Sequence, residues 1–385
     1  MKAVKIQKTG GPEVLEVQEI TLRKPVNDEV LIEHTAIGLN YIDTYHRSGL
    51  YPLTMPAGLG MEASGIIKEI GPEVKNFSVG DKVAYSAVPL GAYSTHRIYK
   101  TNNLVKVPNN VDLTLAATLM TKGLTTYYLL HKTYPVSPGE TILFHAAAGG
   151  VGQIFCQWAK SLNVKVIGTV GSEEKVELAK KNGCDEVINY SKEDFAKKVM
   201  KLTDGKGLPV VYDGVGKSTF EKSLECLKTR GTMVSFGNAS GSLEPIDVTK
   251  MLQPKGLFFV RPSMGQYLTT SKELNEASKT LFEKVSSGKV KVQIFKKYKL
   301  DNVQQAHIDL EARKTTAVAT SFTVAKRPKG ILLSIVFINF LSLKNFFTSG
   351  VLTNVGHTVF TRIFSLAKSI AMPFVRPSIP NFVIL

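Results

Sequence analysis

Hydrophobic and polar positions follow different patterns in successive parts of the chain. In residues 1–120, short β-branched runs separated by Gly- and Pro-containing turns predict mostly strands. The strands expected there are Lys2–Gln7, Val14–Ile20, Glu29–Ile37, Ala63–Ile70 and Lys82–Ser86. Helical spacing begins at Leu113, with Asp112 or Thr114 as the N-cap, and continues to Tyr134.

From residue 140 to residue 262, strand-like runs alternate with helical ones. The expected strands are Thr141–His145, Val164–Val170, Glu186–Asn189, Val210–Asp213, Thr232–Phe236 and Leu257–Val260. The expected helices are Gln153–Leu162, Glu173–Asn182, Asp194–Leu202 and Ser218–Leu227. This alternation predicts an α/β fold with helices on both faces of a parallel sheet. Further on we expect a helix over 271–287, and strands Val290–Lys299 and Thr315–Phe322 that return to the first domain.

A turn of small residues follows the first of these strands. Laid over the dinucleotide pattern G-x-G-x-x-G, residues 147–152 match at Gly149 and Gly152 and carry Ala147 at the first glycine position. Gly149 would let the backbone approach a pyrophosphate, and Gly152 would let the helix pack closely on the strand. Because the helix start also offers N–H groups to phosphate, we predict a dinucleotide site, against the alternative of a crossover turn.

The net charge is high and unevenly distributed. The 385 residues carry 48 Lys or Arg against 32 Asp or Glu, a formal charge of +16. Seven of the basic residues and none of the acidic ones lie in 326–385, which leaves +9 for residues 1–325. Such a charge attracts phosphorylated cofactors or nucleic acid, but it is also common on solvated basic surfaces. The length and a hydrophobic content of 43% suit a globular protein with two domains.

Three widely spaced cysteines, Cys156, Cys184 and Cys226, contain no C-x-x-C pair. This odd number argues against a disulfide framework and against a structural zinc site. Since the chain starts with a strand-like run and no apolar signal core, we expect a reducing, cytoplasmic location.

Residues 326–385 differ in composition from the rest of the chain. The apolar run 330–343 places only fourteen residues between Lys329 and Lys344, whereas a membrane-spanning helix needs about 20. We therefore expect no membrane association except through this segment. We predict a divergent basic and apolar tail that joins neither domain core.

Seven stretches of the sequence carry a family likeness. They are LNYIDTYHRSGLYP (39–52), GLGMEASG (58–65), GLTTYYLL (123–130), FHAAAGGVGQ (144–153), GTVGSEEK (168–175), VVYDGVG (210–216) and MVSFGNASG (233–241). Together they resemble the quinone oxidoreductases related to zeta-crystallin, within the medium-chain dehydrogenase/reductase superfamily. The resemblance runs in unbroken order to about residue 320, and the tail has no counterpart in it.

This resemblance implies a GroES-like, β-rich catalytic domain split around a Rossmann dinucleotide-binding domain. It agrees with the alternation of strands and helices read above. The expected divisions are 1–122 for the first part of the catalytic domain, 123–264 for the Rossmann NADPH-binding domain, 265–325 for the second catalytic part and 326–385 for the tail.

The positions of the zinc ligands in zinc-dependent relatives are changed in this chain. Those relatives place a Cys soon after the third strand and a Gly-His-Glu motif further on. The corresponding stretches here are Gly38-Leu39-Asn40 and Gly60-Met61-Glu62, which offer neither thiolate nor imidazole. We therefore expect no zinc. Quinones suit a site without a metal Lewis acid, because their reduction makes the ring aromatic.

The resemblance implies an active cleft with Asn40, Asp43, Tyr45 and Tyr51 near the nicotinamide and the acceptor. The two tyrosines offer phenolic donors on flat apolar rings that suit a planar quinone. The alternative is that they are core or turn residues of a strand-to-helix junction. No residue of the sequence stands out as an obligatory general acid, and water can serve.

The residues after the second Rossmann strand favour NADPH over NADH. NAD-selective folds carry an acidic residue about 20 positions beyond the glycine turn. Here that place reads Gly171-Ser172, and Glu173 is displaced onto the next helix. Ser172 and Lys175 suit a 2′-phosphate, although a helix cap and a solvated lysine would explain them too. The glycine motif and the resemblance together imply cofactor contacts from Thr126, Ala147, Gly149, Gly150, Val151, Gly171, Ser172, Lys175, Tyr190, Phe236, Gly237, Arg261 and Arg313.

The predicted function is NADPH-dependent quinone reduction without metal, by hydride or stepwise electron transfer. One alternative is an enone or alkenal double-bond reductase of the same fold. Another is a crystallin-like structural role or binding of AU-rich RNA, which the basic charge permits but no RNA-recognition motif supports. The resemblance also implies a homodimer formed through the edge strand near Leu257–Val260.

Overall fold

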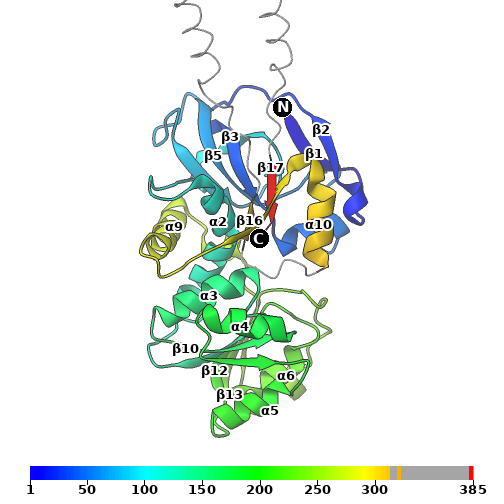
Figure 1. Cartoon of the computed structure of the whole chain (residues 1–385), viewed down its shortest axis with the longest axis vertical. Helices are drawn as coiled ribbons and strands as arrows, with labels where there is room; N and C mark the ends of the chain where they lie inside the picture. The colour runs from blue at the N-terminus through cyan, green and yellow to red at the C-terminus, as the bar shows by residue number, and fades with distance from the viewer. Residues whose placement is uncertain (313–318, 322–380, 385) are drawn as a thin grey trace, which may run out of the picture. The chain divides into compact units, whose positions relative to one another are not determined.

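The computed structural model describes residues 1–312, 319–321 and 381–384, which belong to one compact unit. The described strands form three sheets, of which one is built entirely from the middle of the chain. Figure 1 shows this middle segment in green, with strands β10, β12 and β13 flanked by helices.

The middle sheet is parallel throughout. Its strands are β9 (Thr141–His145), β10 (Lys165–Val170), β11 (Glu186–Asn189), β12 (Leu208–Asp213), β13 (Leu227–Ser235) and β14 (Phe258–Val260). They pair in the order β11-β10-β9-β12-β13-β14. Numbered along the chain, this is 3-2-1-4-5-6, the strand order of the Rossmann fold. The α/β prediction is confirmed.

Successive residues of the middle strands enter two different cores, because side chains alternate across a sheet. Ile142 and Phe144 of β9 lie in one core with Trp158, whereas Leu143 lies in the other with Phe195. The first core also contains residues of α3 (Gly150–Lys160) and α4 (Glu173–Lys181), and the second contains residues of α5 (Phe195–Leu202) and α6 (Phe220–Glu225). A sheet covered on both faces explains why its strands read as continuous apolar runs.

The remaining described strands form a three-stranded and an eight-stranded sheet. The first has the order β2-β1-β4; the second has the order β17-β15-β16-β3-β5-β6-β8, with β7 paired to β3. The bounds are β1 Lys2–Ile6, β2 Glu16–Glu19, β3 Glu29–Gly38, β4 Ala57–Gly58, β5 Glu62–Ile70, β6 Lys82–Ser86, β7 His96–Lys100, β8 Val105–Lys106, β15 Ile294–Lys299, β16 Ala319–Ser321 and β17 Asn381–Ile384. Since β15 and β16 join the sheet of β3, the chain returns to its first part, as the sequence predicts.

Segments from the two ends of the chain lie side by side. Figure 1 shows helix α10 (Val303–Glu311) next to β1 and β2, and Gln304 Nε2 donates a hydrogen bond to the Leu15 carbonyl at 3.0 Å. Strand β17 pairs antiparallel with β15. This pairing differs from the expectation that the tail joins neither core. Its physical reason is the open hydrogen-bonding edge that β15 presents.

Two features of the sequence analysis fall outside the residues that the structure describes, namely Arg313 and the apolar run 330–343. Within the described part of the chain, no helix combines the length and apolar content that a bilayer crossing requires.

Helix α2 (Leu113–Tyr128) connects the catalytic and Rossmann cores and crosses the boundary expected between residues 122 and 123. Its Ala116 belongs to a core with Ala84 of β6, and its Leu119 belongs to the core of the parallel sheet. Asp112 is the N-cap, because its Oδ1 accepts from the Thr114 and Leu115 N–H groups at 2.8 and 3.3 Å. A π-helical turn, Leu129–Thr133, continues the helix.

The other described helices are shorter, apart from α9. They are α1 Tyr41–Ser48, α7 Val248–Met251, α8 Met264–Tyr267 and α9 Ser271–Ser286, with 3-10 turns at Pro12–Val14, Thr101–Asn103, Gln253–Lys255 and Leu300–Asn302. The sequence pattern did not mark α1, because it is short and polar. A capping box between Asn40 and Asp43 starts this helix, and Gly49 ends it at φ 87°.

Candidate active site

The glycine turn lies at the carboxyl end of β9. The strands that precede β9 in the sheet order are reached by one connection and those that follow it by another, so the order reverses between β9 and β12. Open α/β sheets bind ligands at such a switch point. The Ala147 N–H donates to the Thr169 carbonyl at 3.0 Å, which ties the turn to β10. Gly150 and Val151 open α3, where backbone N–H groups have no carbonyl one turn earlier to pair with. This helix start is suited to an anion.

Close backbone contacts exclude a side chain at Gly152, and the Lys122 side chain approaches Gly150. A Cβ at Gly152 would lie 2.5 Å from the Ala146 carbonyl oxygen, and a Cβ at Gly150 would lie 2.7 Å from Cε of Lys122. The Gly149 N–H donates to the Ala146 carbonyl at 2.8 Å, which closes the turn. A glycine cradle at the start of a helix therefore fits the pyrophosphate of a dinucleotide.

The predicted 2′-phosphate residues gather after β10 and β11. A Cβ on Gly171 would lie 2.6 Å from the Tyr190 hydroxyl, so these two residues are in contact. Ser172 precedes α4, but its side chain does not cap the helix, and Lys175 lies in the first turn. The hydroxyl of Ser172 is therefore not committed to the capping role that was its alternative explanation.

The acidic side chain that directly follows Ser172 in the sequence, that of Glu173, is paired with its neighbours. Lys192 Nζ lies 2.7 Å from Glu173 Oε2, and Asn189 Nδ2 donates to the same oxygen at 3.2 Å. The hydrogen bond from Lys192 is the largest of the effects that lower the pKa of Glu173. A carboxylate held in this way offers little repulsion to a 2′-phosphate.

The third group of predicted cofactor residues lies at the end of β13. Arg261 Nη1 donates to the Ser235 carbonyl at 3.1 Å and to the Gly237 carbonyl at 3.0 Å. Phe236 is anchored by its N–H, which donates to the Asp213 carbonyl at 2.8 Å. These contacts bring Phe236, Gly237 and Arg261 together.

Two predicted catalytic residues meet this group. Arg261 Nη2 donates to the Tyr51 hydroxyl at 3.3 Å. The Asn238 backbone N–H donates to the Tyr45 hydroxyl at 3.3 Å, and the Tyr45 and Tyr51 rings pack edge to face with centroids 5.3 Å apart. Burial raises the pKa of Tyr45, so its phenol stays protonated. The tyrosines therefore face the cofactor side of the fold, and Asn238 is a neighbour that the sequence did not indicate.

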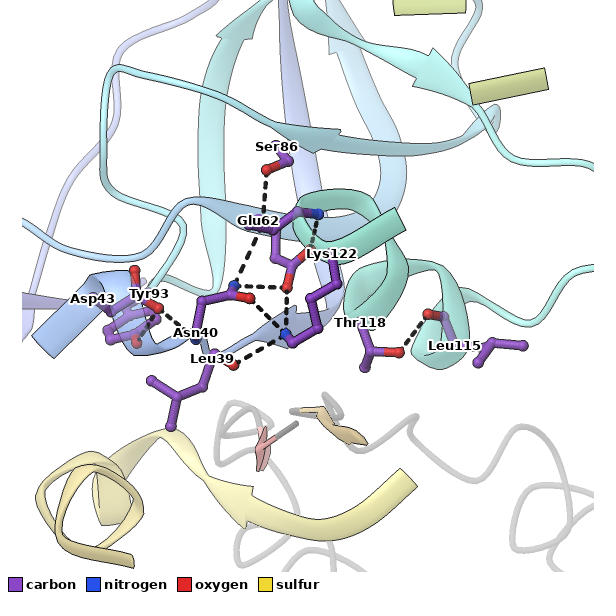
Figure 2. Close-up of polar contacts among 10 residues, drawn as sticks. Leu39, Asn40, Asp43, Glu62, Ser86, Tyr93, Leu115, Thr118 and Lys122 are labelled. Atoms are coloured by element: carbon purple, nitrogen blue, oxygen red, sulfur yellow. Dashed lines mark hydrogen bonds and ion pairs between the residues drawn. The ribbon is translucent and has the colours of Figure 1, made fainter. Parts of the chain in front are cut away.

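The other two predicted catalytic residues belong to a buried polar network, drawn in Figure 2. Asn40 Nδ2 donates to Glu62 Oε1 at 2.7 Å, and Lys122 Nζ donates to Asn40 Oδ1 at 2.5 Å. The Asn40 N–H donates to Asp43 Oδ2 at 2.8 Å. Glu62 Oε2 accepts from the Thr121 N–H at 2.6 Å. One amide side chain thus joins a carboxylate from β5 to an ammonium from α2.

Burial changes the protonation chemistry of this network. Loss of hydration raises the pKa of Asp43 to about 7, and Asp43 Oδ1 has no hydrogen-bond partner among the described residues. Loss of hydration also lowers the pKa of Lys122 to about 8, although Glu62 and Asp43 oppose that effect by favouring the ammonium. Both groups therefore titrate near neutral pH, which is common at functional sites.

A directed chain of hydrogen bonds holds Asp43 from the opposite side. Arg47 Nη1 lies 2.9 Å from His307 Nδ1, and because a guanidinium only donates, Nδ1 accepts. The proton of neutral His307 is then on Nε2, which lies 3.2 Å from the Tyr93 hydroxyl. Tyr93 donates to Asp43 Oδ2 at 2.9 Å. Burial and the neighbouring Arg47 lower the pKa of His307 to about 3, which keeps the imidazole neutral.

Lys122 is a site residue that the sequence patterns did not predict. It is the one charged residue in the helical run between Leu113 and Leu130, and this isolated charge was the available signal. Predicted cofactor residue Thr126 lies one turn further along α2, where its hydroxyl donates to the Lys122 carbonyl at 3.0 Å. Among the residues that the structure describes, no three His, Cys, Asp or Glu side chains gather in a metal-binding group.

Comparison with known protein families gives two matches. Residues 26–109 match the family described as alcohol dehydrogenase GroES-like domain. Residues 150–283 match the family described as zinc-binding dehydrogenase.

Similar proteins cover most of the chain. A quinone oxidoreductase of Pseudomonas aeruginosa is 48% identical over 316 residues, which are 82% of this chain and 97% of the relative. A 2-haloacrylate reductase of a Burkholderia species is 44% identical over 320 residues, 81% of this chain and 96% of the relative. The crystal structure of an Escherichia coli quinone oxidoreductase complexed with NADPH is 46% identical in sequence and has a TM-score of 0.81, with 83% of this chain and 99% of that chain covered.

Proposed function

This chain belongs to the quinone oxidoreductases of the medium-chain dehydrogenase/reductase superfamily, and we propose that it reduces quinones with NADPH without a metal ion. The observation that carries the proposal is the contact at 3.3 Å between Arg261, a predicted cofactor residue, and Tyr51, a predicted acceptor residue. It supports a site in which a nicotinamide and a planar acceptor meet.

The chain's own residues would hold NADPH in three places. The start of α3 at Gly150 would receive the pyrophosphate, Ser172 and Lys175 would receive the 2′-phosphate, and Arg261 would lie near the nicotinamide end. The fit is supported by the close backbone contacts that exclude a side chain at Gly152. When bound, NADPH supplies the hydride.

Tyr45 and Tyr51 would orient the quinone. In the contacts given above, both phenol oxygens accept hydrogen bonds from Asn238 or Arg261, which leaves each hydroxyl proton for an acceptor oxygen. Donors aimed at an oxygen that gains charge lower the barrier, because the site needs no reorganisation during the reaction. Lys122 would supply the positive charge that a metal ion supplies in zinc-dependent relatives, because its ammonium lies beside Asn40 and Glu62.

The test is turnover of NADPH with a panel of ortho- and para-quinones, in the presence and absence of a chelator. We expect oxidation of NADPH with at least one quinone and no effect of the chelator. Failure with every quinone would overturn the proposed activity, and inhibition by the chelator would overturn its metal independence.

A second candidate is reduction of an activated C=C bond, which the relative named 2-haloacrylate reductase favours. A hydride reaches carbon in this reaction too, so the same cofactor site serves both. Product analysis with an α,β-unsaturated ketone separates them, because a saturated ketone would identify the double-bond reductase.

We also propose a homodimer and a cytoplasmic location. Strand β14 is the last strand of its sheet, and Phe258 on it is 61% exposed, which supports pairing with a second copy. The thiols of Cys156 and Cys184 lie 3.4 Å apart as free cysteines, which suits a reducing compartment. Light scattering tests the dimer, and a salt-dependent binding assay with AU-rich RNA tests the remaining alternative.

A further inference from the structure

Quinone reduction by NADPH consumes one proton, and the proposed function leaves its source open. Lys122 is the basic side chain of the network in Figure 2, and the residue is buried, with only 6% of its surface exposed. It reaches from α2 to the glycine turn, because its Cε would be 2.7 Å from a Cβ placed on Gly150. The side chain therefore lies between the expected cofactor cradle and Asn40.

The hydrogen bonds of Lys122 leave its ammonium weakly engaged. Only the contact to Asn40 Oδ1 is short, at 2.5 Å. The Leu39 carbonyl oxygen is 3.5 Å away, and Glu62 Oε1 is 3.6 Å away. Because an ammonium has three protons, two of them are held only by these long contacts.

We propose that the Lys122 ammonium is the proton donor of quinone reduction in this protein. This inference rests on the proposed function, and it makes Lys122 a catalytic residue that contacts the acceptor oxygen. As the quinone carbon receives the hydride, Lys122 transfers a proton to the oxygen that becomes negative. NADPH is oxidised to NADP⁺, and the protonated product enolises to the hydroquinone, because its ring carbon loses a proton to solvent and its second carbonyl oxygen gains one. The neutral Lys122 amine regains a proton from solvent.

The charged and titratable groups facing Lys122 tune this donation. Glu62 approaches from β5 and Asp43 from α1, and both favour the ammonium, whereas burial favours the amine. Asn40 and the Leu39 carbonyl face it from the segment after β3, and Gly150 faces it from α3 without a charge. A general acid works best when its pKa lies near the working pH, and the balance at Lys122 meets that condition.

The variant Lys122→Arg tests the proposal, because it keeps the positive charge beside Glu62 but does not release a proton at accessible pH. We expect NADPH binding, followed by cofactor fluorescence, to be retained. We expect kcat with quinones to fall about 100-fold, the lower end of typical general-acid effects. The loss should shrink for electron-poor quinones, because their reduced anions need protonation least. Lys132→Arg is the matched control, since Lys132 pairs with Glu273 at 2.9 Å outside this network.

The pH profile gives a second readout. Wild-type kcat should be constant below pH 8 and fall above it, as the ammonium loses its proton. Glu62→Gln removes one of the carboxylates that favour the ammonium, so the fall should move to lower pH. In the protein without cofactor, ¹³C NMR of labelled lysine Cε carbons, assigned by comparison with Lys122→Arg, should show one lysine that titrates near pH 8.

The outcomes separate the two proposals. A wild-type enzyme that reduces no quinone removes the proposed function, whatever the NMR titration shows. If the wild-type enzyme reduces quinones, either of two results would overturn only the proton-donor role. One is equal turnover in Lys122→Arg, and the other is a titration of Lys122 above pH 10. If Lys122→Arg does not fold, the pH profile of Glu62→Gln decides, because an unchanged profile would overturn the proton-donor role.

Discussion

Replacing Asp43 by Asn tests the electrostatics of the site through the stability of the protein. In the unfolded chain this carboxyl has its ordinary pKa of 3.8, whereas in the fold burial raises its pKa to about 7. Between these values the folded protein binds one proton more than the unfolded chain does. The contribution of Asp43 to stability is therefore complete below pH 3.8 and is lost as the pH rises through 7.

The magnitude follows from the width of that interval. Each pH unit corresponds to about 1.4 kcal/mol, so roughly three units give a loss of about 4 kcal/mol in the free energy of unfolding. Asn does not titrate, so Asp43→Asn removes this loss. The variant also places an amide where Asp43 Oδ1 has no partner, which adds a pH-independent penalty of about 1–3 kcal/mol.

The assay is urea unfolding of both proteins from pH 4 to pH 7.5, a range that stops below the pKa of Lys122. The free energy of the variant relative to the wild type should increase steadily across this range. The control is Asp204→Asn at an exposed turn position, which should run parallel to the wild type. Parallel curves for Asp43→Asn would refute the assignment of a raised pKa to Asp43.

Three further substitutions test the cofactor and acceptor assignments. Lys175→Ala should weaken NADPH binding about tenfold or more by the loss of one charge-assisted contact, with little effect on NADH; equal effects measured by fluorescence titration would contradict the 2′-phosphate role. Tyr51→Ala should lower quinone turnover about tenfold, one hydrogen bond's worth, with NADPH affinity nearly unchanged; a variant of normal turnover would remove Tyr51 from the site. Gly152→Ala should destabilise the protein by about 1–3 kcal/mol and weaken NADPH binding, because its Cβ would meet the Ala146 carbonyl oxygen at 2.5 Å; unfolding and binding curves like those of the wild type would refute the close-contact argument.

Much of the fold was predictable because the responsible signals are local. Continuous apolar runs such as Thr141–His145 indicate strands buried on both faces, and the spacing of Gly149 and Gly152 indicates the turn that follows. Asp112 was predictable as a cap because capping depends on the next three residues. The short helix Tyr41–Ser48 was not, because its polar sequence has no apolar periodicity and depends on a capping box between Asn40 and Asp43.

The sequence by itself determined the alternation of strands and helices in the middle of the chain, the glycine turn, and the residue types on which the 2′-phosphate prediction depends, since each of these signals spans about 20 positions or fewer. Only the tertiary structure decided that Lys122 lies beside Asn40 and Glu62, which are 82 and 60 positions away along the chain. The same holds for the pKa values of Lys122 and Asp43, because loss of hydration depends on what the whole fold packs around a charge. Local pattern fixes the elements, whereas desolvation and long-range contacts fix the chemistry of the site.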